Sequence, residues 1–306
     1  MEQEALTPPQ GYTARAPAAG DAPKVADLLR ETELRDFGHA EADAVELARD
    51  WETFDLDRDA VIVCHEDGTA AGYGYFFRRG VEQAIIDVYV HPAHTGRGVG
   101  TYLVSELERR SGDVDRIGSG ISASNTAGRT LLEERGYRMV RRFWRMTIEL
   151  DRHPPAPVWP EGTLPTRYLQ RDEQAIWAAV EEAFEDHWEY RPEAFEEWRR
   201  RSIERPGFDP TLWIVAKDGP EVAGVVLARE EPEAGRIDTL AVRRAWRRRG
   251  LGRALTLEAF GEFQRRGRRT IVLNVDSENL TGATHLYEQA GMRVTREIDA
   301  YERVLR

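Results

Sequence analysis

The same order of hydrophobic and polar positions occurs twice along the chain, at an offset of about 152 residues. In the first half, the periodicity predicts helices over 21–31 and 41–51, strands over 61–63, 71–77 and 85–90, a glycine loop with a helix, a strand over 117–122, a helix over 126–135 and closing strands within 139–150. In the second half, the corresponding helices are 174–184 and 192–203, and the strands are 212–216, 222–228 and 237–242. A second glycine loop with a helix follows, then a strand over 271–275, a helix over 280–290 and closing strands within 293–304.

This repeat predicts two α/β domains. Hairpin connections outnumber crossovers in each half, so each domain is expected to hold a mixed, mostly antiparallel sheet flanked by helices. Residues 153–165 contain five of the fifteen prolines, a composition that disfavours helices and central strands. The expected organisation is an N-terminal tail over 1–11, a first domain over 12–150, a linker over 151–165 and a second domain over 166–306.

Composition and charge limit the classes of protein to which the chain can belong. The chain has 306 residues, is 41% hydrophobic and 32% charged, and carries no apolar run long enough for a membrane helix. No signal-peptide pattern opens it, so a cytoplasmic location is expected. The single cysteine, Cys64, lies in an apolar run and is interpreted as a strand residue. A net charge of −11 argues against nonspecific nucleic-acid binding and mildly favours cationic small-molecule partners, and the lack of a long apolar run argues against a membrane partner.

Two glycine loops, Thr95–Gly100 and Arg247–Gly252, each lie between an apolar strand and a helix. Glycines there let a ligand approach the backbone, and the first helical N–H groups have no partner in the helix, which favours a phosphate site. A tight turn without a ligand is the alternative for either loop alone, but the recurrence in both halves favours binding. The glycine spacing matches neither a dinucleotide-binding fingerprint nor a P-loop.

The second loop reads R-x-x-G-x-G and resembles the acyl-CoA pyrophosphate loop of the GNAT superfamily of N-acetyltransferases. The resemblance covers both halves and is strongest in the second. It implies acetyl-CoA as cosubstrate, held at the pyrophosphate by Arg247, Arg248, Arg249, Gly250, Leu251 and Gly252. It also implies that the backbone of Leu240, Ala241 and Val242 pairs with the pantetheine arm. A solvated basic face is the alternative interpretation of the arginines.

The GNAT resemblance also suggests residues for proton transfer. Asn279 matches the position that commonly contacts CoA, and Tyr287 matches the tyrosine that protonates the departing thiolate. The alternatives are a helix cap for Asn279 and a partly buried aromatic residue for Tyr287. Asp238 is the first candidate for the base that deprotonates the amine, although a solvated or salt-bridged strand residue beside Arg236 is equally consistent with the pattern. A second candidate group comprises Glu185, Asp186 and His187.

The first half departs from this pattern. Leu132 stands where Tyr287 stands in the second half, and Thr95 replaces the first arginine of the loop. A leucine cannot donate a proton, so the second domain is expected to hold the only turnover site. His91 and His94 flank the first loop without further ligands at metal spacing, and no metal site is expected.

Tandem domains with an active second half resemble mycothiol synthase and its relatives, which acetylate the cysteinyl amine of a cysteinyl-glucosaminyl-inositol. Acids and aromatic residues over 181–198 suit a cationic or sugar-like small-molecule amine. An aminoglycoside or a polyamine is an alternative acceptor, and a noncatalytic acyl-CoA-binding protein is an alternative function. Arginines within 199–201 and 265–269 leave nucleic-acid binding as a weaker alternative. The sequence leaves the oligomeric state open.

Overall fold

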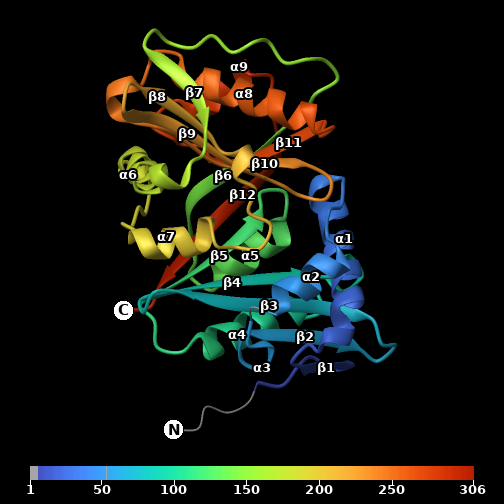
Figure 1. The fold of residues 1–306 in the computed structure, drawn as a ribbon. Helices are drawn as coiled ribbons and strands as arrows, with labels where there is room; N and C mark the ends of the chain where they lie inside the picture. The colour runs from blue at the N-terminus through green and yellow to red at the C-terminus, as the bar shows by residue number, and fades with distance from the viewer. Residues whose placement is uncertain (1–5, 53) are drawn as a thin grey trace. The chain divides into compact units, whose positions relative to one another are not determined.

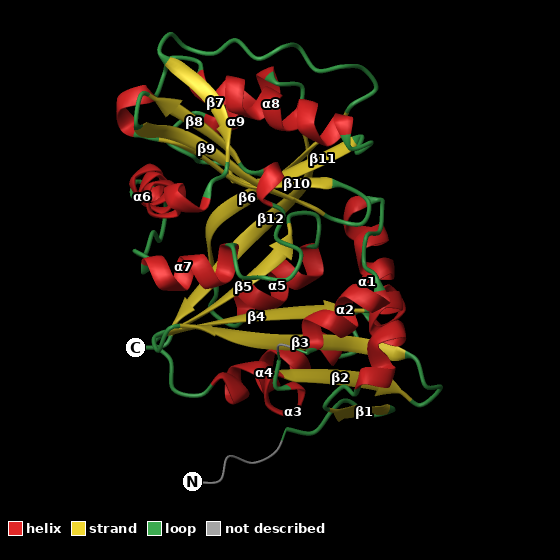
Figure 2. Ribbon diagram, viewed as in Figure 1, coloured by secondary structure: helices red, strands yellow, loops and turns green. Residues whose placement is uncertain are grey.

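The computed structural model describes residues 6–52 and 54–306. The chain divides into two compact units. Unit 1 comprises Met1–Arg142 and Arg296–Arg306, and unit 2 comprises Phe143–Thr295. Both are α/β, as the alternation of helix and strand patterns predicts, and Figures 1 and 2 show helices against the sheet in each.

Unit 1 contains a six-stranded sheet in the order β1-β2-β3-β4-β5-β12. Only β4 and β5 pair in parallel, because a helix connects them, whereas the neighbouring strands are joined by hairpins or come from distant parts of the chain. Its elements are β1 (Tyr12–Arg15), α1 (Ala22–Phe37), α2 (Ala44–Trp51), α3 (Leu56–Asp59), β2 (Ala60–His65), β3 (Ala70–Arg79), β4 (Gln83–Val90), α4 (Val99–Ser111), β5 (Arg116–Ser122), α5 (Thr126–Glu134) and most of β12 (Arg293–Val304).

Unit 2 repeats this plan with the strand order β6-β11-β10-β9-β8-β7. Here only β10 and β11 are parallel. Its elements are most of β6 (Arg138–Glu149), then β7 (Thr163–Arg167), α6 (Glu173–Phe184), α7 (Phe195–Ser202), β8 (Ile214–Asp218), β9 (Glu221–Glu230), β10 (Gly235–Val242), α8 (Leu251–Arg265), β11 (Thr270–Asp276) and α9 (Ala283–Gln289). One apolar cluster lies between the sheet and α8 with α9, and another lies under α6 and α7.

The last strand of each unit comes from the other half of the chain. β12 pairs with β5 from Ile298↔Ser122 to Val304↔Arg116, and β6 pairs with β11 over residues 143–149 and 270–276. We expected the strands of 293–304 to complete the second domain and those of 139–150 to complete the first. Buried Asp299 shows how unit 1 accommodates β12, because it accepts a bidentate hydrogen bond from Arg142 at 2.6 and 3.0 Å.

Several elements differ from the periodicity-based expectation. The helix expected over 280–290 begins only at Ala283, after Gly282 in the left-handed region with φ 78°. β8 begins at Ile214 because a 3₁₀ turn occupies Pro210–Leu212. β1, β7 and α3 were not expected. β7 lies at the edge of its sheet, where Pro165 can be accommodated although it lacks an N–H group.

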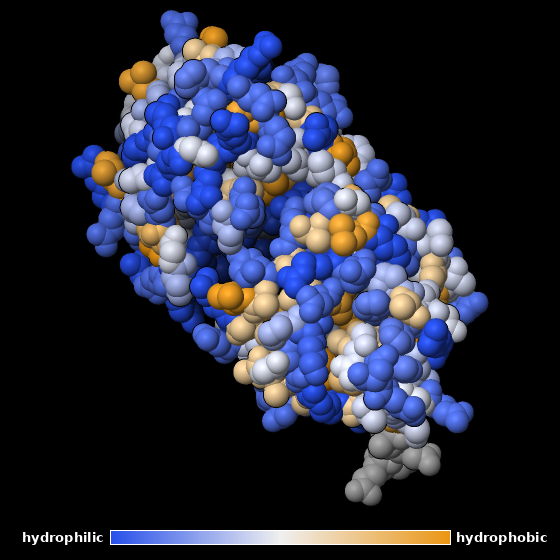
Figure 3. Space-filling view, turned by 90° about the vertical axis from the view of Figure 1, so that its right-hand side faces the viewer, coloured by the Kyte–Doolittle hydropathy of each residue, from blue (hydrophilic) through white to orange (hydrophobic). Residues whose placement is uncertain are grey.

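Figure 3 shows one face of the molecule, on which hydrophobic residues form small groups separated by hydrophilic ones. In the described part of the chain, none of the helices has the length and apolar character needed to cross a membrane.

Candidate functional site

The two parallel strands of unit 2 separate partway along their length. β10 and β11 pair only from Gly235 to Ile237 of β10, and an irregularity follows at Asp238. Beyond it, Leu240–Val242 stay paired with β9, but their other backbone edge has no partner among the described strands. An extended ligand can therefore pair with this edge, as expected for the pantetheine arm.

The glycine loop places the N-terminus of α8 at the end of β10. Gly250 is the N-cap, with φ 88° in the left-handed region. In the first hydrogen bond of the helix, the Ala254 N–H donates to the Gly250 carbonyl at 3.0 Å. The N–H groups before Ala254, including that of Leu251, therefore have no acceptor within the helix. These unpaired donors and the positive end of the helix dipole favour an anion here.

The arginines of this loop fall into two groups. Arg247 is tied to the protein: its Nε donates to the Val242 carbonyl at 3.1 Å, its Nη2 donates to the Ala183 carbonyl at 3.1 Å, and its Nη1 lies 3.2 Å from Asp186. In contrast, Arg248 and Arg249 are exposed and have no polar partner among the described residues. Two guanidinium groups beside the helix N-terminus are thus available for an anion such as a pyrophosphate.

Arg248 also has an unusual backbone. Its φ of 59° lies in the left-handed region, as does that of Gly96 (φ 77°) at the corresponding place in unit 1. A non-glycine residue pays about 1–2 kcal/mol for this conformation. The arginine at a position where unit 1 has glycine is consistent with the predicted role of its side chain in binding pyrophosphate, which stays a prediction.

Arg253 was not among the expected site residues. It lies in the first turn of α8, three residues after Gly250, and has no ion-pair partner in the described part of the chain. Its spacing from the loop could have identified it, because residues in the first turn lie beside an anion at the helix end.

The two glycines of the second loop have different roles. A Cβ on Gly250 would meet no atom within 4 Å, so its positive φ is the reason for glycine there. A Cβ on Gly252 would lie 2.8 Å from Cδ1 of Leu286 on α9. We expected both glycines to admit the pyrophosphate, and this stays a prediction; the missing side chain of Gly252 also permits α8 to pack against α9.

Tyr287 lies on α9 and is 6% exposed within the apolar cluster under α8. Burial raises the pKa of its phenol, so the group stays protonated at neutral pH. No hydrogen-bond partner of the hydroxyl exists among the described residues. The phenol is therefore a proton donor that is not committed elsewhere in the protein.

Asn279 is half-buried, three residues before the N-cap of α9. Its Oδ1 accepts hydrogen bonds from the Thr281 N–H at 2.8 Å and from the Ala283 N–H at 3.4 Å. In unit 1, Asn125 caps α5 directly. The carbonyl of Asn279 thus holds the loop that precedes α9, and its amide group has no partner among the described residues.

Asp238 lies at the irregularity of β10, and its side chain is 30% exposed. One carboxylate oxygen is 3.3 Å from Arg205, and the other is 3.3 Å from Arg229. We had considered a salt bridge with neighbouring Arg236, but that residue pairs with Glu231 instead. Both oxygens of Asp238 are engaged with cations, so a role as base would require this carboxylate to give up an ion pair.

His187 follows α6 and is half-buried, with its ring 4.2 Å from that of Phe184. Burial lowers the pKa of the imidazole, an effect that the Asp276 charge opposes and the Arg247 charge reinforces. His187 is therefore neutral at neutral pH and lies within electrostatic range of the end of β11 and of the glycine loop. Its ring nitrogens have no hydrogen-bond partner among the described residues.

The acidic segment over 181–198 is less negative than its composition suggests. Glu182 lies 2.6 Å from Arg243, and Asp186 lies 2.8 Å from Arg244. Arginines thus neutralise much of the negative charge of this segment, the acidic wall of unit 2. The further pairs are Glu185 with Arg244, Asp186 with Arg247 and Glu193 with Arg201.

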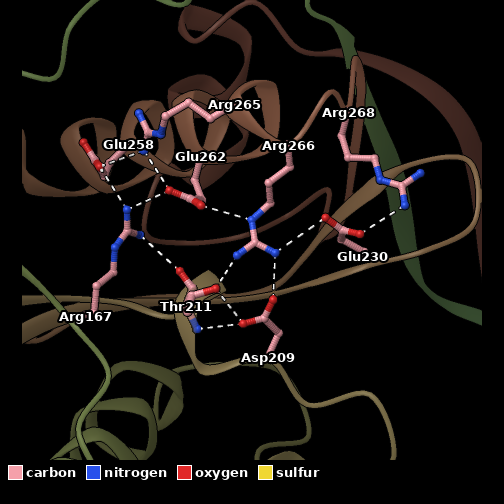
Figure 4. A network of polar contacts seen from close by, with 9 residues as sticks. All are labelled: Arg167, Asp209, Thr211, Glu230, Glu258, Glu262, Arg265, Arg266 and Arg268. Carbon is pink, nitrogen blue, oxygen red and sulfur yellow. Dashed lines mark hydrogen bonds and ion pairs between the residues drawn. The ribbon is translucent and has the colours of Figure 1, made fainter.

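The basic run over 265–269 is also largely paired within unit 2. Figure 4 shows Arg266 between Asp209 at 2.7 Å and Glu262 at 3.0 Å, and Arg268 beside Glu230 at 3.0 Å. These contacts connect α8 with β9 and with the turn before β8. Arg265, Arg266 and Arg268 thus serve intramolecular ion pairs.

In unit 1, the glycine loop has a different surrounding. A Cβ on Gly98 would lie 3.3 Å from Cγ of Pro9, so the N-terminal segment packs against this loop. Leu132, at the place of Tyr287, is buried in the core. Nδ1 of His94 and the Tyr12 hydroxyl form a hydrogen bond at 2.9 Å, and burial lowers the pKa of the His94 imidazole. Among the described residues, no group of three potential ligands could hold a metal ion.

Comparison with known proteins shows the family of the chain. The acetyltransferase (GNAT) family model matches residues 23–137 and again residues 147–292. The chain belongs to the GNAT family. Both halves are matched, so it is a tandem member and an N-acetyltransferase, and enzymes of this family use acetyl-CoA.

Three relatives show how far the similarity extends. A GCN5-related N-acetyltransferase from Sphaerobacter thermophilus is 39% identical, with 98% of each chain covered and a TM-score of 0.89. A tandem GNAT protein from the clavulanic acid biosynthesis pathway shares the fold at 17% identity, with a TM-score of 0.74 and coverage of 96% and 98%. The mycothiol acetyltransferase of Cellulomonas flavigena is 29% identical over 68% of this chain, which spans 64% of that relative.

Proposed function

We propose that unit 2 transfers the acetyl group of acetyl-CoA to the primary amine of a small molecule. The observation that carries the proposal is the N-terminus of α8, where Arg248 and Arg249 have no polar partner among the described residues and the backbone of Arg248 is strained. When bound, acetyl-CoA supplies an activated acetyl group on a thiolate leaving group.

The pyrophosphate is held by the free N–H groups of α8 together with Arg248, Arg249 and Arg253. The pantetheine arm pairs with the open edge of β10 at Leu240–Val242, and Asn279 lies on the loop beyond β11. This arrangement directs the thioester into the space where β10 and β11 separate.

Tyr287 acts as the acid. The acceptor nitrogen attacks the thioester carbonyl carbon, the carbon–sulfur bond breaks, and the departing sulfur takes the phenolic proton. The new amide nitrogen then gives up its extra proton, which restores the phenol. An ordinary phenol has a pKa about 1.5 units above that of a thiol, and burial increases this difference, so the proton moves late or in concert with bond breakage.

His187 is the better base in this arrangement. It is neutral at neutral pH and its nitrogens are not engaged, whereas Asp238 is held by two arginines. An ammonium group that loses its proton to His187, directly or through water, becomes the nucleophile.

The acceptor we favour is a cysteinyl amino sugar like that of the mycothiol acetyltransferase relatives. A polyamine would require several unneutralised carboxylates, and arginines pair with much of the acidic wall of unit 2. An amine with one positive charge and many hydroxyl groups fits this surface better.

The test is a panel of cysteinyl amino sugars, aminoglycosides and polyamines with acetyl-CoA, followed by thiol release and by the mass of each product. Acetylation of the cysteinyl amine supports the proposed acceptor. Release with another amine alone would replace the acceptor but keep the reaction. Tight acetyl-CoA binding without release in the entire panel would favour an acyl-CoA-binding protein.

A further inference from the structure

Unit 1 has three tyrosines and an aspartate at positions where unit 2 has mostly apolar residues. On the sheet face covered by α1, Tyr73 lies opposite Tyr89, and Tyr75 lies opposite Asp87. The matching cross-strand pairs of unit 2 are Val225 with Ala241 and Leu227 with Thr239. The same backbone positions thus support an apolar layer in unit 2, so the fold does not require tyrosines or a carboxylate there.

Asp87 lies where β4 and β5 separate. The two strands pair only as far as Ile86 and Ser119, and Asp87 is the next residue of β4. Burial raises the pKa of its carboxyl group, and hydrogen bonds from the Tyr75 hydroxyl and the Gly120 backbone offset this only in part. Asp87, Tyr75 and Tyr89 are each half-buried, so most of the Asp87 side chain is removed from water but the group is not sealed from solvent.

No arginine or lysine neutralises Asp87 in the described part of the chain. The buried carboxylates of unit 1 are treated differently. Each has an arginine within 3.0 Å, in the pairs Asp21–Arg15, Asp59–Arg58, Glu106–Arg109 and Asp299–Arg142. A desolvated carboxylate without a countercharge is unfavourable unless it takes up a proton or a cation.

Three tyrosines lie close enough to this carboxylate to interact with its charge. The Asp87 charge acts on the phenols of Tyr73, Tyr75 and Tyr89, raising the pKa of each after burial. The ring centres of Tyr73 and Tyr75 are 5.8 Å apart, and Trp51 and Phe54 lie 5.9 and 5.5 Å from Tyr73 and Tyr75, respectively. A carboxylate among electron-rich rings is the chemistry that binds alkylammonium groups.

We propose that unit 1 binds a small organic cation through its ammonium group at Asp87, with Tyr75 and Tyr89 contacting the alkyl part. The cation supplies the countercharge that Asp87 lacks in the protein. This site does not depend on acetyl transfer in unit 2.

The test titrates the full chain with propylammonium or tetramethylammonium chloride against sodium chloride at equal ionic strength. Calorimetry measures affinity, and thermal unfolding measures stabilisation. We expect wild type to bind at least one organic cation and to gain thermal stability from it but not from sodium. Asp87→Asn should weaken binding by more than about tenfold.

Two further variants sharpen the result. Tyr75→Leu with Asp87→Thr introduces the residues of unit 2 and should abolish binding. Asp27→Asn removes an exposed carboxylate of α1 and should leave affinity unchanged. The proposal is wrong if wild type binds neither cation, or if Asp87→Asn binds as wild type does. Should Asp87→Asn fail to fold, cation-specific thermal stabilisation of wild type that Tyr75→Phe and Tyr89→Ala reduce still supports the site, and its absence refutes it.

Discussion

Replacing Arg248 with glycine should make the protein more stable and its binding of CoA weaker. In the folded protein, Arg248 has a φ of 59°. Glycine in place of Arg248 removes a strain of about 1–2 kcal/mol from the folded protein. The greater freedom of glycine in the unfolded chain lowers the stability again by about 0.5–1 kcal/mol. The free energy of unfolding should therefore rise by about 0.5–1 kcal/mol.

Binding should change in the opposite direction. Arg248 is exposed and has no partner in the part of the chain that the structure describes, so its guanidinium gives up no observed ion pair when it meets a phosphate. A charge-assisted hydrogen bond contributes about 1.5–3 kcal/mol, and exposure to solvent places this one at the lower end. Its loss should raise the Kd for CoA by about tenfold.

Denaturant unfolding of the ligand-free chain and calorimetry with CoA measure the two effects separately. Arg248→Asn is the matched control, because asparagine tolerates the left-handed region but carries no charge: it should weaken binding as the glycine variant does. Arg248→Lys should restore most of the affinity. Wild-type affinity in Arg248→Gly would refute the role of this side chain, and a loss of stability would refute the argument from strain.

Three other changes test the remaining parts of the site. Tyr287→Phe should lower kcat by about ten- to a thousandfold with little change in CoA affinity, and an unchanged kcat would remove the phenol from the mechanism. For His187, the lowered pKa means that the unfolded chain binds a proton more readily than the folded one, so stability should decline as pH falls below about 6.5, and His187→Gln should lessen this decline. If His187 is the base, the same variant should remove the acid limb of the kcat/KM profile, whereas a profile that changes only in Asp238→Asn would assign the base to Asp238. Gly252→Ala should destabilise the fold by about 1–3 kcal/mol because its Cβ would lie 2.8 Å from Leu286, and Leu286→Ala in the same chain should recover part of the loss; additive losses would refute the packing argument.

Local patterns predicted much of this molecule. Helical and strand periods located most elements within a few residues, and the hairpin-rich order indicated mixed sheets. Gly98 and Gly250 precede helices, and both have the positive φ that glycine permits. The roles of Tyr287, Asn279 and the loop arginines stay predictions, now with defined surroundings.

Charge partners could not be predicted in the same way. The acids over 181–198 suggested a negative wall, but arginines over 243–247 and Arg201 neutralise much of it. Asp238 was considered beside Arg236, yet its partners are Arg205 and Arg229. Such pairs join residues far apart in the chain, and each contributes too little energy to leave a local signature.

The sequence by itself determined the repeat, the order of helices and strands and the two glycine loops, because these depend on periodicity and on backbone preferences of neighbouring residues. Only the tertiary structure decided that β12 pairs with β5 and that β6 pairs with β11. A strand exposes the same backbone hydrogen-bonding groups to any edge, so its own residues do not specify which half of the chain it completes. Contacts distant in sequence, such as that of Arg142 with Asp299, make this choice.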